Sequence, residues 1–148
     1  MFFIEMIGRV KAVNISERKG TKKTNVYSCK ITQTGLKGDS HSGDWHRQVS
    51  LLAKESIEKM KKQGLSLNYG DFAENITTEG ISLHELPIGT KIKINNVVLE
   101  VTQIGKECHH GCEIRKLVGN CIMPKEGIFT KVIKTGTISV DDKIEVIK

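Results

Sequence analysis

The sequence predicts a mostly β protein, a closed or nearly closed β-barrel with one or two small helices. Two observations favour this fold class. Short apolar runs, many of them alternating with polar residues, recur between turn signals along the 148 residues, and only one segment has a convincing helical period. Many short strands beside a single helix are typical of a small barrel. The length predicts one domain, residues 1–148, which can bury a core without disulfides or a structural metal.

Strands are expected in both halves of the chain. An alternating apolar pattern predicts the first, and further apolar runs predict the others, over residues 7–15, 26–31, 48–52, 92–94, 97–101, 128–133 and 143–147. Asn95 and Asn96 fit a two-residue hairpin turn between two of these strands. Turn signals at residues 134–136 and 141–142 separate the last ones, and the polar residues 16–23 are predicted to form a loop.

One helix is predicted over residues 53–63. Ile57 and Met60 are three residues apart and would share an apolar face, while lysine and glutamate side chains supply the exposed face. Gly64 is a typical residue for the end of a helix.

Composition and charge narrow the class of protein. The net charge of +6 fits either a lysine-rich solvated surface or an anionic partner such as a phosphorylated cofactor. Aromatic residues make up only 5% and the basic residues are spread along the chain, which argues against nucleic acid as a partner. No recognisable secretion signal and no apolar stretch near the roughly 18 residues of a membrane span occur, so a cytoplasmic location without a membrane partner is expected.

Three of the four cysteines and two of the five histidines cluster between residues 108 and 121. Cytosolic thiols stay reduced, so two functional interpretations compete. One is a zinc site, with ligands from Cys108, Cys112, Cys121 and one of His109 or His110. The other is a reactive thiolate, whose pKa would be lowered by the nearby Arg115, Lys116 and Lys125. A third interpretation is that a cysteine simply packs as a buried apolar side chain. This interpretation is favoured for Cys29, which is isolated in a strand pattern.

Two further segments carry candidate ligand-binding residues. Residues 34–48 are polar and rich in glycine, which lets a backbone approach a ligand closely. Lys37 and Arg47 could hold a phosphate there, and Asp39 and His41 could ligate a metal or carry protons. An ordinary surface loop is the alternative. Residues 70–80, which include Asn75, combine acidic and amide groups that could bind a polar ligand.

These segments, in this order, resemble the MOSC family, named for the C-terminal domain of the molybdenum cofactor sulfurase. The matching stretches are residues 35–43, 47–52, 70–77 and 121–129, and the likeness is strongest over residues 18–148. The resemblance implies a β-barrel, in agreement with the strand pattern. It also implies a role in binding the molybdenum cofactor (molybdopterin) or in carrying sulfane sulfur.

The resemblance implies roles for particular residues. Cys121 matches the cysteine regarded as the functional thiol of the family, and its thiolate could ligate molybdenum directly or hold a persulfide. Arg47 could pair with the pterin phosphate as a bidentate donor. The predicted lining of the cofactor pocket consists of Lys37, Asp39, His41, Arg47 and Asn75.

Three functions follow from these features. The leading hypothesis is a sulfur-carrier or molybdenum-cofactor-binding accessory protein, with a molybdoenzyme or a cofactor-biosynthesis protein as partner and a cysteine desulfurase as sulfur donor. The second is a molybdenum-cofactor-dependent oxidoreductase of small N-hydroxylated substrates, so both a sulfurtransferase-like and an oxidoreductase activity stay open. The third is a non-catalytic module stabilised by zinc at Cys108, Cys112 and His109. Pyridoxal phosphate is associated only with the aminotransferase-like domain of the larger sulfurase proteins, which has no counterpart in these residues.

Overall fold

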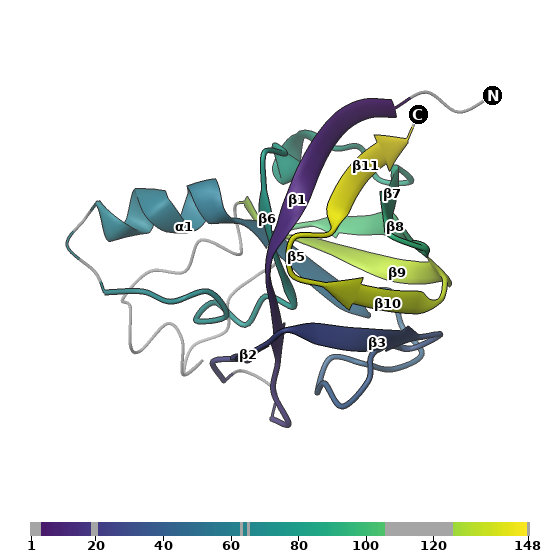
Figure 1. Cartoon of the computed structure of the whole chain (residues 1–148), viewed down its shortest axis with the longest axis horizontal. Coiled ribbons are helices and arrows are strands. Elements are labelled where there is room, and N and C mark those ends of the chain that lie inside the picture. The colour runs from purple at the N-terminus through teal and green to yellow at the C-terminus, as the bar shows by residue number, and fades with distance from the viewer. Residues whose placement is uncertain (1–3, 19–20, 63, 65, 106–125, 148) are drawn as a thin grey trace.

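Seven strands close into a barrel in the computed structural model, which describes residues 4–18, 21–62, 64, 66–105 and 126–147 (Figure 1). Each strand pairs with the next, and the last pairs with the first, which leaves no open edge in the barrel. In their order around the barrel the strands are β1 (Ile4–Ile15), β11 (Lys143–Ile147), β7 (Lys91–Ile94), β8 (Val97–Ile104), β9 (Ile128–Lys134), β5 (Val49–Ala53) and β6 (Ile76–Glu79).

The long strand β1 closes the barrel by serving two sides of it. Its first half pairs antiparallel with β11, and its second half pairs antiparallel with β6 and with the short strand β2 (Thr24–Val26). The register with β6 shifts between Val10 and Ala12, and such irregularities let a strand bend around a barrel. The pair of β5 with β6 is parallel, whereas the other barrel pairs are antiparallel.

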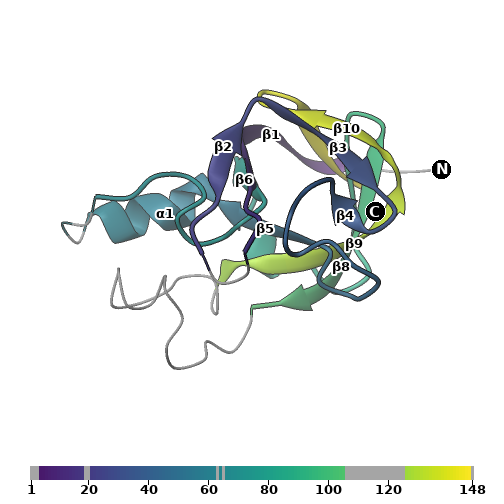
Figure 2. The same ribbon diagram turned by 90° about the horizontal axis from the view of Figure 1, so that it is seen from below.

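A small second sheet lies beside the barrel. It consists of β10 (Gly136–Ser139), β3 (Ser28–Thr32) and β4 (Gly35–Leu36), in that order. Figure 2 shows β3 and β10 side by side along one flank, with β4 below them. Because β4 lies near the start of the glycine-rich segment of residues 34–48, this second sheet fixes where that segment begins.

The helix α1 (Lys54–Lys61) follows β5 directly and lies outside the barrel (Figures 1 and 2). Its buried side chains Ile57 and Met60 pack in an external apolar cluster that includes Phe72 and Phe129. Gly64 has a φ of +90° and its N–H donates to the carbonyl of Lys61 at 3.0 Å, which ends the helix. A short 3-10 helix, η1 (Leu83–Glu85), lies between β6 and β7.

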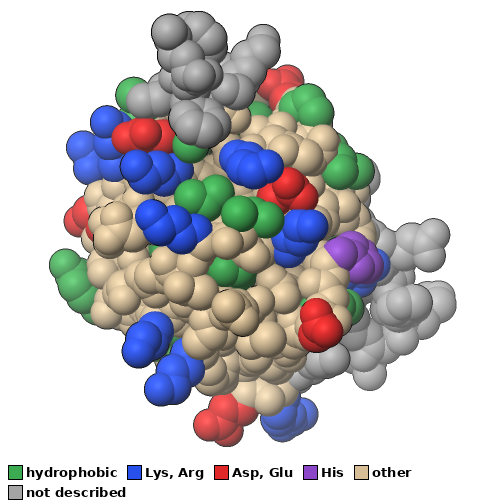
Figure 3. Space-filling model, turned by 90° about the vertical axis from the view of Figure 1, so that its right-hand side faces the viewer, with side chains coloured by type: hydrophobic (Ala, Val, Ile, Leu, Met, Phe, Trp, Pro, Cys, Tyr) green, Lys and Arg blue, Asp and Glu red, His purple; other side chains and the backbone are tan. Residues whose placement is uncertain are grey.

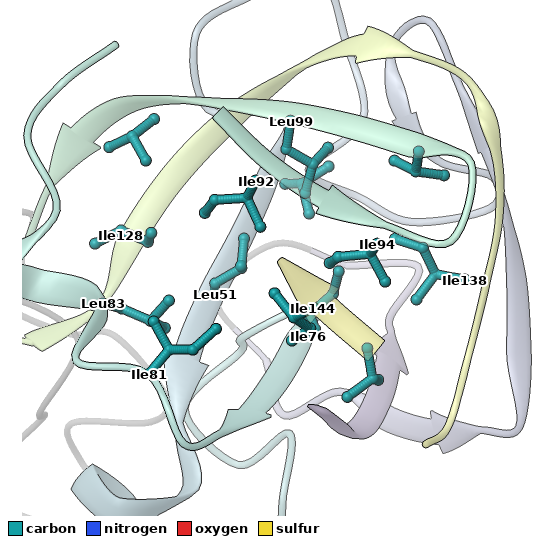
Figure 4. Packing of buried hydrophobic residues seen from close by; sticks show 14 of the residues in the cluster. Leu51, Ile76, Ile81, Leu83, Ile92, Ile94, Leu99, Ile128, Ile138 and Ile144 are labelled. Atoms are coloured by element: carbon teal, nitrogen blue, oxygen red, sulfur yellow. The ribbon is translucent and has the colours of Figure 1, made fainter. Parts of the chain in front are cut away.

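The main core fills the barrel with aliphatic side chains. Leu51, Ile92, Leu99 and Ile144 are fully buried and come from four different strands (Figure 4). Since successive side chains of a strand point to opposite faces, Leu51 joins this interior cluster while its neighbour Leu52 joins the external cluster beneath α1.

The predicted fold class is confirmed, and most elements lie where the sequence places them. The hairpin of β7 and β8 turns at Asn95 and Asn96, with Asn95 at a φ of +55°. The predicted helix is slightly longer than α1. The single strand predicted over residues 26–31 is wrong in detail, because the chain breaks at Tyr27 into β2 and β3. Three strands were not predicted: β4, at the start of the glycine-rich segment; β6, within the polar segment 70–80; and β10, which begins within the predicted turn at residues 134–136.

None of the helices within the described ranges is long and apolar enough to cross a membrane.

Candidate functional site

Arg47 lies at the centre of a polar and aromatic cluster on the outer face of β8 and β9, which we call the Arg47 cluster; its members are Trp45, His46, Arg47, Gln103 and Phe129. The side-chain oxygen of Gln103 accepts a hydrogen bond from Nε of Arg47 at 2.9 Å and lies 2.8 Å from Nε2 of His46. The side-chain nitrogen of Gln103 donates to the carbonyl of Gly105 at 2.7 Å. One glutamine therefore ties Arg47 and His46 to the end of β8.

The guanidinium of Arg47 lies near two aromatic rings. Its central carbon lies 5.9 Å from the ring centroid of Trp45 and 5.3 Å from that of Phe129, distances at which cation–π attraction operates. Within the described part of the chain, hydrogen bonding occupies Nε and leaves the two terminal nitrogens open. A guanidinium oriented in this way can bind a carboxylate, phosphate or other oxyanion through two parallel hydrogen bonds.

Gly105 and Glu126 are the described residues on either side of residues 106–125. The N–H of Gly105 donates to the carbonyl of Gly127 at 2.7 Å. The carboxylate of Glu126 accepts hydrogen bonds from the Ser56 hydroxyl at 2.7 Å and from Nζ of Lys59 at 3.1 Å. Both flanking residues are thus tied to the barrel and to α1, on the side where Gln103 holds Arg47.

The predicted catalytic and metal-binding residues Cys121, Cys108, Cys112 and His109 lie outside the described residues, as does His110. Among the side chains that the structure describes, no three or more from His, Cys, Asp and Glu are arranged to hold a metal ion. Both the thiolate and the zinc interpretations therefore stay predictions.

A second group of polar residues lies at the end of β1, and Asp39 is at its centre. Oδ1 of Asp39 accepts hydrogen bonds from Nζ of Lys23 at 2.7 Å and from the backbone N–H of Ser16 at 2.9 Å. Its Oδ2 accepts from the backbone N–H of His41 at 3.0 Å. The two charged side chains are buried, with 1% of Lys23 and 0% of Asp39 exposed, so this ion pair fixes the glycine-rich segment onto β1 and β2.

Burial by itself would raise the pKa of the Asp39 carboxyl. The hydrogen bond and positive charge of Lys23 oppose this effect, and Asn75 and the N–H of Ser16 add further hydrogen bonds. Together they hold the pKa of Asp39 below its ordinary value, so the carboxylate is ionised at neutral pH.

Asn75 is fully buried and joins three strands. Its side-chain oxygen accepts from the N–H of Ser50 at 3.0 Å, and its nitrogen donates to the carbonyl of Asn14 at 3.3 Å. The side-chain nitrogen of Asn14 in turn donates to the hydroxyl of Thr77 at 3.1 Å. These contacts make Asn75 a link between β1, β5 and the start of β6.

Glu74 belongs to the same buried network. One carboxyl oxygen accepts from the N–H of Gly70 at 3.0 Å and from the Thr77 hydroxyl at 2.7 Å, whereas the other has no hydrogen-bond partner among the described residues. Complete burial raises the pKa of Glu74 to about 7, against the lowering effect of these hydrogen bonds. Burial of Glu74 therefore favours the neutral form of its carboxyl up to a higher pH than for an exposed glutamate.

The structure brings some predicted site residues together and keeps one apart. The backbone of His41 contacts Asp39, and its ring centroid lies 6.5 Å from that of Trp45, which adjoins Arg47. Asp39 and Asn75 are structural neighbours through the buried network. The side chain of Lys37 is exposed, and no contact of it with these residues is seen in the described part of the chain.

Sequence reasoning missed Lys23, Gln103 and Glu74. Lys23 is one of several lysines in a basic run, and no local pattern distinguishes it from Lys22. Gln103 looks like an ordinary polar residue of a strand. Glu74 lies inside the segment that the sequence singled out, but only the three-dimensional structure shows its burial.

The positive charge is not gathered into one patch on the face shown in Figure 3. Lys and Arg side chains are scattered there, with acidic and apolar side chains between them. Elsewhere, basic side chains share acidic partners: Glu100 forms ion pairs with Lys91 at 3.0 Å and with Lys131 at 3.4 Å.

The sequence matches a known protein-family model. The model of the MOSC domain family matches residues 38–145, which is most of the chain. No curated protein sequence matches the chain.

Several solved structures share the fold. The YuaD protein of Bacillus subtilis superposes with a TM-score of 0.83 at 19% identity, covering 100% of this chain and 99% of that one. YiiM of Escherichia coli gives a TM-score of 0.68 at 19% identity, covering 95% of this chain and 70% of that one. YiiM of Geobacillus stearothermophilus gives 0.67 at 18% identity, with 100% and 76% covered. At these identities the likeness shows a common fold.

Proposed function

Because this chain belongs to the MOSC domain family, we propose that it is an accessory protein of molybdoenzyme maturation that acts through Cys121. In this role the thiolate of Cys121 carries sulfane sulfur or binds the molybdenum of a bound cofactor. The partners would be a cysteine desulfurase as sulfur donor and a molybdoenzyme or cofactor-biosynthesis protein as acceptor. The protein would act in the cytoplasm, where its thiols stay reduced.

The observation that supports this proposal best is the connection from Arg47 through Gln103 to Gly105. Gly105 is the last described residue before residues 106–125, which include Cys121. A permanent cation that keeps two nitrogens open at this place can hold an oxyanion, such as a phosphate, near the end of β8. The donor set thus fits a phosphorylated cofactor, and when bound the cofactor would supply a molybdenum centre that a thiolate can ligate.

Transfer of sulfur from a donor persulfide to Cys121 needs no separate oxidant or reductant. The Cys121 thiolate attacks the outer sulfur of a donor persulfide, a new S–S bond forms at Cys121, and the donor cysteine leaves as a thiolate. In delivery, a nucleophile of the acceptor attacks the outer sulfur and the Cys121 thiolate leaves. Each step exchanges one bond to sulfur for another, so atoms and electrons balance. Arg115, Lys116 and Lys125, which are close to Cys121 in the sequence, would favour the thiolate form of Cys121 on which both steps depend.

Intact mass and metal analysis of protein purified without reductant would test the proposal. A mass gain of one sulfur atom in the wild-type chain, absent from Cys121→Ser but retained in Cys29→Ser, is the result expected for a sulfur carrier. Molybdenum and pterin that are lost in Cys121→Ser would indicate the cofactor-binding form, and turnover of an N-hydroxylated substrate would then indicate an oxidoreductase. Stoichiometric zinc in both wild type and Cys121→Ser, with no added sulfur, would instead support the zinc-stabilised module.

A further inference from the structure

A groove of about 640 Å³ opens beside the hairpin that connects β1 and β2. Arg47 does not line it, so it is distinct from the Arg47 cluster. We propose that this groove binds the phosphate ester of a small ring compound, with Arg18 and Lys22 holding the phosphate. The volume falls within the range of roughly 300–1,000 Å³ that is typical of small-molecule sites.

The charged lining favours an anion. Arg18 and Lys22 bring two positive charges, against one negative charge from Glu17. Nζ of Lys22 lies 3.9 Å from the nearest carboxylate oxygen of Asp71, too far for a hydrogen bond, and 44% of its side chain is exposed. Arg18 forms no ion pair within the described residues. Both cations can therefore turn toward a ligand without breaking a short contact.

The backbone that carries Arg18 is fixed in place. The carbonyl of Arg18 accepts hydrogen bonds from the hydroxyls of Thr21 at 2.8 Å and Ser16 at 3.0 Å. Ser16 is itself held by Asp39 and by the N–H of Ser40, which donates to the Ser16 carbonyl at 2.8 Å. One wall of the groove thus rests on the buried pair of Lys23 and Asp39, and a preformed wall reduces the entropy lost on binding.

Gly38 lines the groove with exposed backbone. It has a φ of +85°, and its N–H has no hydrogen-bond partner within the described residues. A Cβ at this position would meet no atom within 4 Å, so the backbone is open to a ligand on that side. Free N–H groups in turns of this kind are suited to phosphate oxygens.

Two apolar residues in the lining explain why a ring should accompany the phosphate. Ile15 and Val26, on the paired strands β1 and β2, are partly buried and pack against the barrel core. They leave an apolar strip beside the two cations. Inorganic phosphate would use only the polar half of the groove, so a phosphorylated ring compound should bind more tightly.

Calorimetric titration of the full chain with AMP, adenosine and inorganic phosphate tests the proposal. We expect saturable binding of AMP and weaker binding of phosphate, and at least tenfold weaker AMP binding in the double variant Arg18→Gln/Lys22→Gln. The control Lys93→Gln/Lys134→Gln removes the same charge outside this groove and should change affinity less than twofold. Absence of saturable binding, equal loss in both double variants, or adenosine binding as tight as AMP would overturn the proposal.

Two further measurements separate this proposal from the function proposed for Cys121. Cys121→Ser should bind AMP as the wild type does, so phosphate binding lost with that thiol alone would contradict a separate groove. Titration of the wild-type and Arg18→Gln/Lys22→Gln chains with molybdopterin then identifies the source of the phosphate. If the double variant binds molybdopterin more weakly than the wild type, the groove holds the phosphate of the cofactor. If both proteins bind molybdopterin equally while the double variant binds AMP more weakly, the groove holds a free phosphorylated metabolite.

Discussion

Lys23 and Asp39 form a buried ion pair in which Nζ lies 2.7 Å from Oδ1 and neither side chain is more than 1% exposed. The pair joins the start of β2 to the glycine-rich segment, two parts of the chain that share no strand pairing with each other. Its burial means that neither charge has water to replace its partner.

Removing one member of this pair should destabilise the protein strongly. For Asp39→Asn we expect a loss of about 3–5 kcal/mol in the free energy of unfolding, because the buried charge of Lys23 loses the carboxylate that lies 2.7 Å from it. Urea unfolding followed by circular dichroism measures this change. Glu79→Gln, which removes an exposed partner of Lys54, is the matched control and should cost far less.

The same pair predicts an acid limb of stability. Because the pKa of Asp39 is lowered in the folded state, its contribution is complete above the unfolded pKa of about 3.9 and is lost as the pH falls through the lower folded value. Wild type should therefore lose stability on acidification below about pH 4 more steeply than Asp39→Asn. Parallel curves for the two proteins would contradict this assignment.

Glu74 predicts the opposite pH dependence. Its pKa is raised from 4.5 to about 7 in the folded state, so its contribution to stability is largest below pH 4.5 and is lost as the pH rises to about 7. The loss should be roughly 3 kcal/mol over that interval, from 1.36 kcal/mol per pH unit. Glu74→Gln should remove this slope in unfolding experiments between pH 4.5 and 8. A variant that keeps the wild-type slope would show that another group is responsible.

Gly70 and Gly89 offer a test of close backbone packing. Both have positive φ angles, +96° and +95°, but a Cβ at Gly70 would lie 2.5 Å from the carbonyl oxygen of Lys23, whereas one at Gly89 would meet nothing within 4 Å. Gly89→Ala should cost about 1–2 kcal/mol from backbone strain alone. Gly70→Ala should cost clearly more in the same unfolding assay, because it also pushes Lys23 away from its place beside Asp39.

Cys29 should react slowly with alkylating reagents. Burial raises the pKa of its thiol, and Sγ donates a hydrogen bond to the carbonyl of Lys37 at 3.6 Å. We therefore expect Cys29→Ser to leave the fast phase of thiol modification unchanged, as followed by iodoacetamide labelling and peptide mass mapping. Loss of the fast phase in this variant would move the reactive thiol from Cys121 to Cys29.

Arg47→Lys should lower function while preserving the fold. Lysine keeps the charge but lacks Nε and the planar fork, so it cannot bond Gln103 and an oxyanion in the same geometry. We expect about tenfold slower sulfur loading from a small persulfide donor, or about tenfold weaker cofactor retention, with little change in unfolding. Arg9→Lys is the control: the side chain of Arg9, on β1, donates to the Asp141 carbonyl at 3.1 Å and has no other hydrogen-bond partner among the described residues. Equal effects of the two substitutions would remove Arg47 from the site.

The sequence by itself determined the elements whose evidence is local. The hairpin of β7 and β8 follows from two apolar runs around Asn95 and Asn96, and α1 follows from one amphipathic stretch ending before Gly64. The barrel class and the family resemblance depend on such short patterns and on their order along the chain, and both are confirmed.

Only the tertiary structure decided which polar residues are buried and paired. The strand β6 escaped prediction because its polar residues Thr77 and Thr78 are buried between β1 and β5, where pairing with distant strands outweighs local preference. Lys23 and Asp39 are 16 residues apart, and Arg47 and Gln103 are 56 apart. Closure of the barrel brings these partners together, and no periodicity within a short window of sequence records a contact over such distances.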